Sequence, residues 1–239
     1  MKLKTISTLC FAASTLLVAS SAMAWESEDG QHSTSAGVAL GSDYMWRGYS
    51  QSDNELAISG NFDYAHSSGL YAGTWASNVD FALTDDNGVD EQAHIEVDVY
   101  VGFGGQFGES GVSYDVGFLR YIYPSTADGN GDWNEYYASL SYSFLTAFVG
   151  YTDEYLGDDD VDATYYNLSA SYDLPADFSL AAAVGYYDID GNGAEYSDWS
   201  IGISKEVAGF GFDLSYIDTD EDNDNLAEGR AVFTISKSM

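Results

Sequence analysis

The chemistry of the chain is concentrated in carboxylates set two positions apart, most plainly within the stretch Ala93–Phe103. Glu96 and Asp98 share one parity of this stretch, and Ile95 and Val97 begin the other. Because a β-strand sends successive side chains to opposite faces, we expect one acidic face and one apolar face here. A wall that carries such carboxylates attracts cations and rejects anions.

The same alternation recurs in most of the other segments that have strand character. If the strands close into a ring, these acidic parities line its interior, since a charge on a lipid-facing position costs free energy. The expected interior carboxylates are Glu55, Asp63, Glu96, Asp98, Asp115, Glu135, Asp198 and Asp213.

Two arginines are further candidates for the lining of a pore, in a chain that holds only seven Lys and Arg residues. Arg47 lies in the first long loop. It either folds back onto interior carboxylates such as Glu96 or Asp98 and narrows the pore, or pins the loop to the rim, and the second role is favoured. Arg120 has the same two alternatives, although it shares the apolar parity near the end of its strand.

One acidic loop has a partial metal-binding motif. Asp188, Asp190 and Asn192 match the start of a calcium loop, but its twelfth position, where a bidentate Glu belongs, is Trp199. Strands rather than helices are expected on both sides. We therefore interpret the segment as a turn-rich acidic loop with these three residues as weak metal candidates, and expect no cofactor beyond loosely bound divalent cations.

Catalytic chemistry is not expected. The three histidines, His32, His66 and His94, fall on separate segments, and no Ser/His/Asp spacing or His-rich metal set emerges. A phospholipase of the outer membrane would need a Ser–His pair side by side on the outer wall. We predict that the protein is not an enzyme.

Alternation, with Gly, Asp and Asn clusters as breaks, predicts about twelve strands near the 9–11 residues that cross a bilayer when tilted. The expected ranges are Ser33–Ser42, Glu55–Ala65, Leu70–Val79, Ala93–Phe103, Val112–Tyr121, Glu135–Tyr142, Leu145–Tyr151, Thr164–Leu174, Phe178–Tyr186, Asp198–Glu206, Phe210–Tyr216 and Arg230–Met239.

The connections between these strands alternate between long and short. Asp43–Asn54 is long, Ser67–Gly69 is short, and the sorting continues to the last connection. Short periplasmic turns and longer outer loops are typical of outer-membrane barrels. In hydrocarbon an open sheet would leave its edge N–H and C=O groups unpaired, so the strands must close. We predict an all-β fold: a single closed antiparallel up-and-down transmembrane barrel with long acidic outer loops.

The head of the chain has the pattern of a secretory signal peptide. Lys2 and Lys4 precede the apolar run Ile6–Ser20, and Ala22-Met-Ala24 has the form of a cleavage site. We expect residues 1–24 to be removed, residues 25–34 to form a short periplasmic segment, and residues 35–239 to form the barrel. The one cysteine, Cys10, lies in the leader, so disulfides and thiolate metal sites are excluded.

The charge balance also excludes a class of partner. Without Lys2 and Lys4, five bases would face 39 acids, a net charge of −34. Such a chain does not bind nucleic-acid phosphates. The acidity indicates a solvated surface and an attraction for cations.

Two stretches carry a family resemblance. Gly41–Ser52, with Tyr44, Arg47 and Gly48, and the later Gly69–Asn78 resemble the TorF family of proteobacterial porin-like proteins. The similarity extends from about Ser35 to the end of the chain. It implies an outer-membrane barrel with a channel role and supplies no substrate. One departure is Met239, where many outer-membrane barrels end in an aromatic residue.

The sequence therefore favours a porin-like channel in the outer membrane of a Gram-negative bacterium, for passive diffusion of small hydrophilic solutes with a preference for cations. Its expected partners are membrane lipid, lipopolysaccharide and the assembly machinery. The alternative is a non-conducting structural or binding barrel whose acidic loops collect divalent ions. A third reading is a secreted soluble β-protein such as a lectin.

Overall fold

The computed structural model describes residues 25–84, 90–126, 131–190, 195–222 and 224–239. Within these ranges the chain consists of β-strands, turns and loops. None of the described residues lies in a helix that is long and apolar enough to cross a membrane. The expected leader, residues 1–24, lies outside the described residues.

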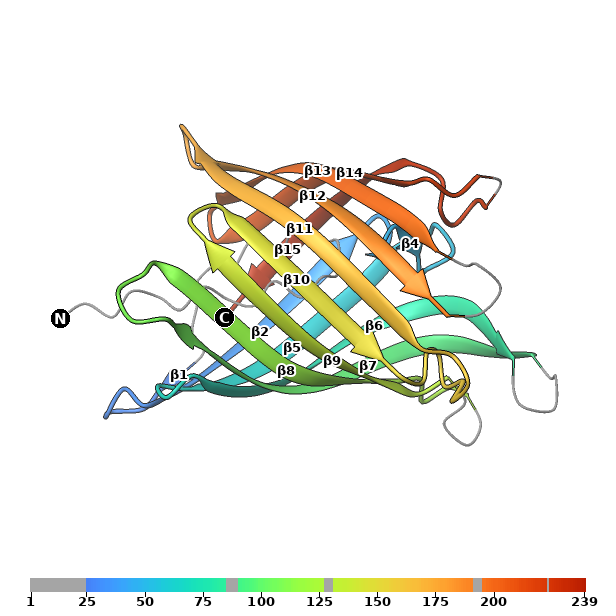
Figure 1. Cartoon of the computed structure of the whole chain (residues 1–239). Helices are drawn as coiled ribbons and strands as arrows, with labels where there is room; N and C mark the ends of the chain where they lie inside the picture. Colours follow the sequence, from blue (N-terminus) through green and yellow to red (C-terminus); the bar gives the residue numbers. More distant parts are fainter. Residues whose placement is uncertain (1–24, 85–89, 127–130, 191–194, 223) are drawn as a thin grey trace.

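Twelve strands form one antiparallel ring (Figure 1), because the thirteenth member of the sheet, β1 (Trp25–Glu26), only extends the edge of β2. The ring consists of β2 (His32–Gly41), β5 (Ala57–His66), β6 (Leu70–Thr84), β7 (Asp90–Gln106), β8 (Val112–Ile122), β9 (Trp133–Tyr142), β10 (Leu145–Thr152), β11 (Ala163–Leu174), β12 (Phe178–Ile189), β13 (Tyr196–Val207), β14 (Phe210–Thr219) and β15 (Arg230–Ser238). The twelve expected strands are confirmed.

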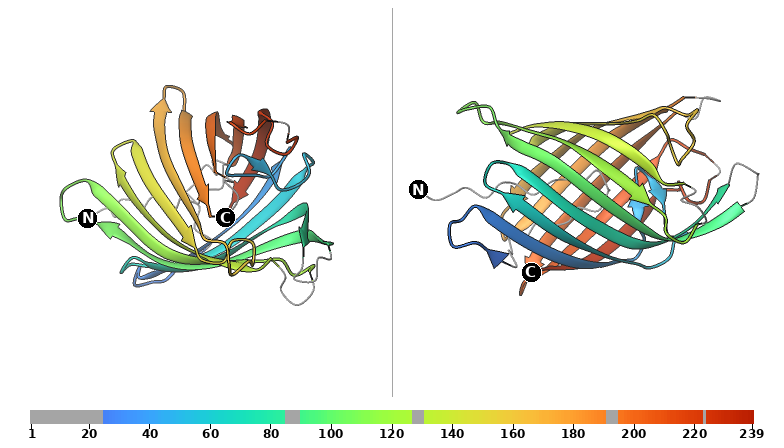
Figure 2. Two further views of the ribbon diagram at one scale, coloured as in Figure 1. Left: turned by 45° about the vertical axis from the view of Figure 1, so that its right-hand side comes forward. Right: turned by 90° about the horizontal axis from the view of Figure 1, so that it is seen from below.

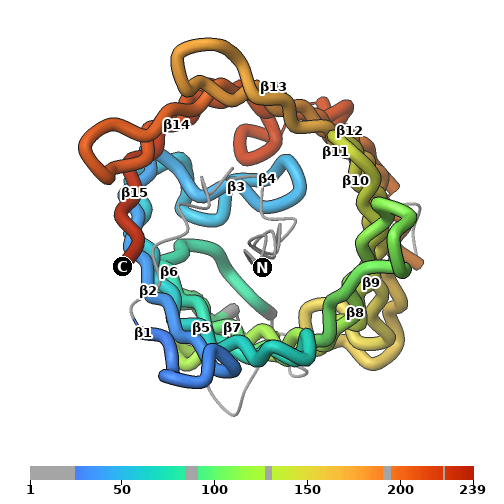
Figure 3. The backbone as a smooth tube through the Cα atoms, turned by 90° about the vertical axis from the view of Figure 1, so that its left-hand side faces the viewer, coloured from blue at the N-terminus to red at the C-terminus, as the bar shows by residue number. Residues whose placement is uncertain are grey.

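The ring closes at its first strand. β2 pairs with β5 on one side and with β15 on the other, and Leu40 lies opposite both Ile58 and Ile235. Figure 3, which looks along the barrel, shows the strands as a continuous wall around an interior. Closure satisfies the backbone groups that an open edge would leave unpaired, and the prediction of a closed barrel is confirmed.

The two faces of the wall differ as the alternation predicts. On β7, Ile95 and Val99 each expose 47% of their surface on the outer face, whereas Glu96 and Asp98 expose 2% and 6% inside. The outside is apolar almost throughout, and the interior holds carboxylates, tyrosines and small residues. A soluble sandwich would bury the Ile95 and Val99 side between two sheets, whereas here these side chains lie on the outside of a single closed ring.

The connections are sorted between the two ends of the ring (Figure 2). Tight turns such as 143–144 and 208–209 gather at the end where β2 begins and β15 ends, and the longer connections gather at the other. Ser143 has a φ of 58°, and Gly209 a φ of 76°, the left-handed backbone that two-residue hairpins require.

Interior tyrosines lie flat against glycines of the neighbouring strand. Tyr71 is the register partner of Gly102, and Tyr137 is the partner of Gly117. A Cβ atom on Gly102 would overlap the Tyr71 hydroxyl group. The missing side chains therefore leave the space in which these rings lie along the wall.

A hairpin inside the barrel is not predicted from the sequence. β3 (Met45–Trp46) and β4 (Tyr49–Ser50) form a small hairpin within the first long loop, and Figure 3 shows both strands inside the ring. The loop turns back into the barrel rather than extending from it, and it organises the candidate site.

Candidate functional site

The β3–β4 hairpin is richer in apolar and aromatic side chains than the other loops, and these side chains pack against the inside of the wall. Met45 is fully buried and packs with Ile217 of β14 and Val232 of β15. On the other strand of the hairpin, Tyr49 meets Tyr196 of β13 edge to face at 5.1 Å. The hairpin thus contacts the wall on more than one side.

Arg47 is the residue at the tip of this hairpin. Its Nη2 donates to Oε2 of Glu135 on β9 at 2.5 Å, and the two side chains expose only 1% and 3% of their surface. A φ of 47° at Arg47 and 87° at Gly48 makes the tight turn that directs the guanidinium inward. Arg47 therefore folds back into the interior, and its carboxylate partner is Glu135 instead of Glu96 or Asp98.

Aromatic rings enclose the guanidinium group. Its central carbon lies 4.3 Å from the ring centroids of Trp46 and Tyr165 and 4.8 Å from that of Tyr187. Such contacts strengthen as water is removed. Burial alone would lower the pKa of Arg47, but Glu135 and the surrounding hydroxyls hold the pKa above its ordinary value, so the side chain stays charged.

The rings continue across the interior at the same level. Trp46 meets Trp133 and Tyr187 edge to face at 6.0 and 5.8 Å, and Trp133 stacks on Tyr121 at 4.0 Å. Tyr155, from the connection between β10 and β11, packs against Trp133 at 5.6 Å. The hairpin and these rings form an aromatic layer near the long-loop end.

Two carboxylates of β7 differ sharply in their partners. Glu96 accepts hydrogen bonds from Tyr44 at 2.8 Å and from Tyr123 at 3.0 Å. Asp98 is equally buried, yet its Oδ1 has no hydrogen-bond partner. A buried carboxylate oxygen without a partner is costly in a folded protein.

Four more of the expected interior carboxylates also face inward. Tyr165 donates to Asp198 at 3.0 Å, and Ser215 donates to Asp213 at 2.7 Å. Toward the short-turn end, Tyr71 donates to Asp115 at 2.7 Å and Tyr100 donates to Asp63. Hydroxyl donors rather than bases therefore accompany the acids over most of the interior.

Two expected residues lie apart from this interior set. Glu55 is exposed in the segment that precedes β5. Arg120 lies on β8 between two buried neighbours, so its side chain is on the outer parity, where it donates to Asn134 at 3.0 Å and pairs with Asp132 at 3.3 Å.

The candidate calcium loop lies at the rim. Asp188 is the last residue but one of β12 and Asp190 directly follows the strand. Both are exposed, whereas Asn192 lies outside the described residues. Across the described residues no group of three or more His, Cys, Asp or Glu side chains is placed to hold a metal ion. Divalent binding at this loop stays a prediction.

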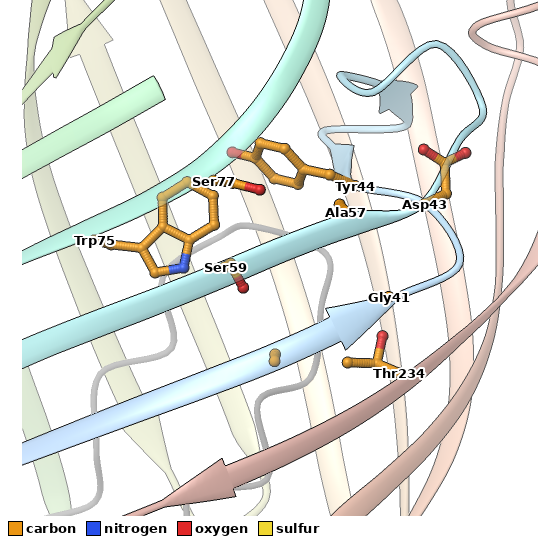
Figure 4. A pocket seen from close by; sticks show the side chains of 9 residues that line it. Gly41, Asp43, Tyr44, Ala57, Ser59, Trp75, Ser77 and Thr234 are labelled. Carbon is orange, nitrogen blue, oxygen red and sulfur yellow. The ribbon is translucent and has the colours of Figure 1, made fainter. Parts of the chain in front are cut away.

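A small cavity separates the foot of the hairpin from the wall formed by β2, β5, β6 and β15 (Figure 4). Small side chains dominate this wall, in contrast to the aromatic residues of β8, β9 and β12. The lining consists of Ala39, Gly41, Asp43, Tyr44, Ala57, Ser59, Trp75, Ser77 and Thr234. The cavity therefore lies beside the residues that lead into the hairpin, Asp43 and Tyr44.

Sequence reasoning did not identify the aromatic enclosure of Arg47. One signal was available: Tyr44-Met-Trp-Arg-Gly-Tyr49 is rich in aromatic residues, whereas the remaining long loops are acidic and polar. A loop of that composition gains free energy by burial.

The chain belongs to the Gcw_chp family, which is described as a bacterial protein of unknown function, because the model of that family matches residues 26–239. The description of this family does not mention TorF, so the resemblance to the TorF family stays a prediction. Among the curated proteins, none matches the chain.

Several solved porins have a similar fold. The NanC porin has a TM-score of 0.53 at 12% identity, covering 84% of this chain and 97% of its own. The KdgM porin has a TM-score of 0.52 at 8% identity, covering 85% and 97%. A structure of the KdgM porin in complex with disordered oligogalacturonate has a TM-score of 0.52 at 9% identity. The match covers 86% of this chain and 99% of that porin. The fold of this chain is therefore porin-like.

Proposed function

We propose that this member of the Gcw_chp family is an outer-membrane channel for small hydrophilic solutes and that it prefers cations. The observation that carries the proposal is the ring itself: a closed wall with an apolar outside and a carboxylate-lined inside. Such a wall satisfies its own backbone in lipid, and its interior provides a polar path. The likeness to porins supports the channel role.

Cation preference follows from the charges inside. Asp63, Glu96, Asp98, Asp115, Asp198 and Asp213 face the interior. Two arginines of the described residues lie on the same side, and each is paired with a further acid, Arg47 with Glu135 and Arg230 with Asp43. An unbalanced acidic interior raises the local cation concentration and excludes anions. A polyanion such as the oligogalacturonate bound by KdgM is therefore not the class of solute that we propose for this chain.

The hairpin sets the width of the path. Because Arg47 is held at Glu135 and Trp46 packs into the aromatic layer, we place the path of solutes on the other side of the hairpin, along the small residues that line the cavity of Figure 4. We therefore expect a low conductance compared with wide, water-filled porins.

Purified protein refolded into a planar bilayer tests the proposal. Under a gradient of KCl the reversal potential should have the sign of a cation-selective pore, with small discrete conductance steps. Heat-denatured protein treated in the same detergent is the control. A reversal potential of the opposite sign would remove the cation preference, and silence in all bilayers would remove the channel.

A second candidate function is a structural barrel that does not conduct. The observation that favours it is the burial of two residues of the hairpin: Met45 and Arg47 expose 0% and 1% of their surface. If the hairpin never moves, the aromatic layer closes the interior. Silence of the native protein combined with conduction after deletion of residues 44–51 would support this reading.

The remaining assignments are proposals of the same kind. The apolar outside is suited to membrane lipid, and the acidic loops are suited to divalent ions that bridge to lipopolysaccharide phosphates. Delivery to the outer membrane would use the leader of residues 1–24 and the barrel assembly machinery. We propose no enzymatic role.

A further inference from the structure

Asp98 differs from the other interior acids in what surrounds it. Across the sheet its register partners are Trp75 of β6 and Tyr121 of β8, both of which face the interior. Along its own strand it lies between Glu96 and Tyr100, each about 6.6 Å away at two residues' rise. A carboxylate is thus flanked by aromatic rings on both sides.

The second observation is the free oxygen. Asp98 exposes 6% of its surface, and its Oδ1 has no hydrogen-bond partner. The two nearby acids are occupied, because Glu96 accepts from Tyr44 and Tyr123 and Glu135 holds Arg47. Buried carboxylates are retained when something pairs with them. Among these three acids, Asp98 is therefore the one with a buried oxygen that lacks a partner, and on the base of the cluster Nε and Nη1 of Arg47 lack partners as well.

We propose that Asp98 binds a small monovalent cation, an alkali ion or ammonium, on its route through the barrel. Oδ1 would provide the charge, and the faces of Trp75 and Tyr121 would provide cation–π contacts. A divalent ion is less suitable, because it would need a second carboxylate for charge balance, and Glu96 and Glu135 already have partners. The inference rests on the proposed channel function and locates its cation preference at one residue.

Asp213 on the opposite wall shows why the rings matter. Its Oδ2 also lacks a partner, but Oδ1 accepts from Ser215 and the register partners are Ser204 and Thr234. These neighbours offer hydroxyls and no aromatic face. We therefore assign the site to Asp98.

Crystals of the full barrel soaked in rubidium chloride test the site directly. Anomalous scattering should show Rb⁺ within about 3 Å of Asp98 Oδ1, in the range of oxygen ligation. Asp98→Asn keeps the shape of the side chain and removes its charge, so the peak should vanish. The matched control is Glu55→Gln, which removes an exposed acid and should leave the peak unchanged. No peak in the native crystals, or a peak that survives Asp98→Asn, overturns the proposal.

A second measurement covers the case in which the variant does not crystallise. In a planar bilayer the ratio of K⁺ to Cl⁻ permeability should fall by about tenfold for Asp98→Asn and stay constant for Glu55→Gln. An unchanged ratio in Asp98→Asn contradicts the assignment. Failure of the native protein to conduct would refute the channel alone, because the rubidium peak does not depend on conduction.

Discussion

Arg47 and Glu135 are 88 residues apart in the sequence and join within the barrel through a single charged hydrogen bond of 2.5 Å. Glu135 lies over Gly150 of the next strand, where a Cβ atom would come within 2.8 Å of its carboxyl carbon. The absence of a side chain at Gly150 thus leaves space for the carboxylate of Glu135, and this carboxylate holds the hairpin through Arg47. Three consequences of this pair can be measured.

Arg47→Ala should open the path. Removal of one partner leaves Glu135 buried and unpaired, which costs about 3–5 kcal/mol in comparable buried pairs, so the hairpin should detach from the wall. We expect larger single-channel conductance from a barrel that still shows the heat-dependent shift in gel mobility of a folded ring. Arg120→Ala is the matched control, because its ion pair with Asp132 lies on the outer parity with a half-exposed guanidinium. Equal conductance in both variants would refute the idea that the Arg47–Glu135 ion pair holds the hairpin in the path.

The double replacement Arg47→Ala, Glu135→Ala separates attraction from burial. Each single replacement leaves one buried charge, whereas the double replacement leaves none. The loss in free energy of unfolding should therefore be smaller for the double variant than the sum of the two singles, by about 1–3 kcal/mol. Urea unfolding in lipid vesicles measures it. Simple additivity would show that the two groups do not interact.

A thiol probe reports the position of the hairpin directly. The one cysteine in the sequence is Cys10, in the expected leader, so Met45→Cys would introduce the sole thiol of the processed chain. Met45 is fully buried, and its thiol should react slowly with a charged reagent. Adding Arg47→Ala should raise the labelling rate by about tenfold or more. The labelling rate follows the equilibrium constant for local opening of the hairpin, which rises tenfold for each roughly 1.4 kcal/mol by which the free energy of opening falls. Rapid labelling of Met45→Cys alone would place the hairpin outside the barrel.

The interior glycines should resist substitution. Gly102→Ala places a methyl group where the Tyr71 hydroxyl lies, and overpacking of this kind costs about 1–3 kcal/mol. Gly60→Ala is the control, since its methyl group would point to the outer face and meet its nearest atom at 3.3 Å. The two variants are compared by urea unfolding. An equal loss in free energy of unfolding for Gly60→Ala and Gly102→Ala would show that the packing of Tyr71 on Gly102 does not stabilise the barrel.

The ring could be predicted from sequence, and the hairpin could not, for one physical reason. A strand's alternation is a local property, so the twelve ranges and the burial of Glu96 and Asp98 follow from nearest neighbours in the chain. Whether Arg47 points out or in depends on Glu135, which no local pattern connects to it. The short strand β1 was missed similarly, because two residues carry no period.

Charge on the outer face should be tolerated according to depth. Val99 lies near the middle of β7 and Phe103 nearer its short-turn end, and both side chains face outward. If lipid covers this face, the charge of Val99→Lys should lower the free energy of unfolding by about 2–4 kcal/mol. The charge of Phe103→Lys should lower it by only about 0–1 kcal/mol. Val99→Ala and Phe103→Ala correct for the lost apolar surface. Unfolding in vesicles measures each value relative to its alanine control. Equal charge terms at the two positions would mean that no hydrocarbon layer surrounds the barrel, and the channel proposal would then lose its physical basis.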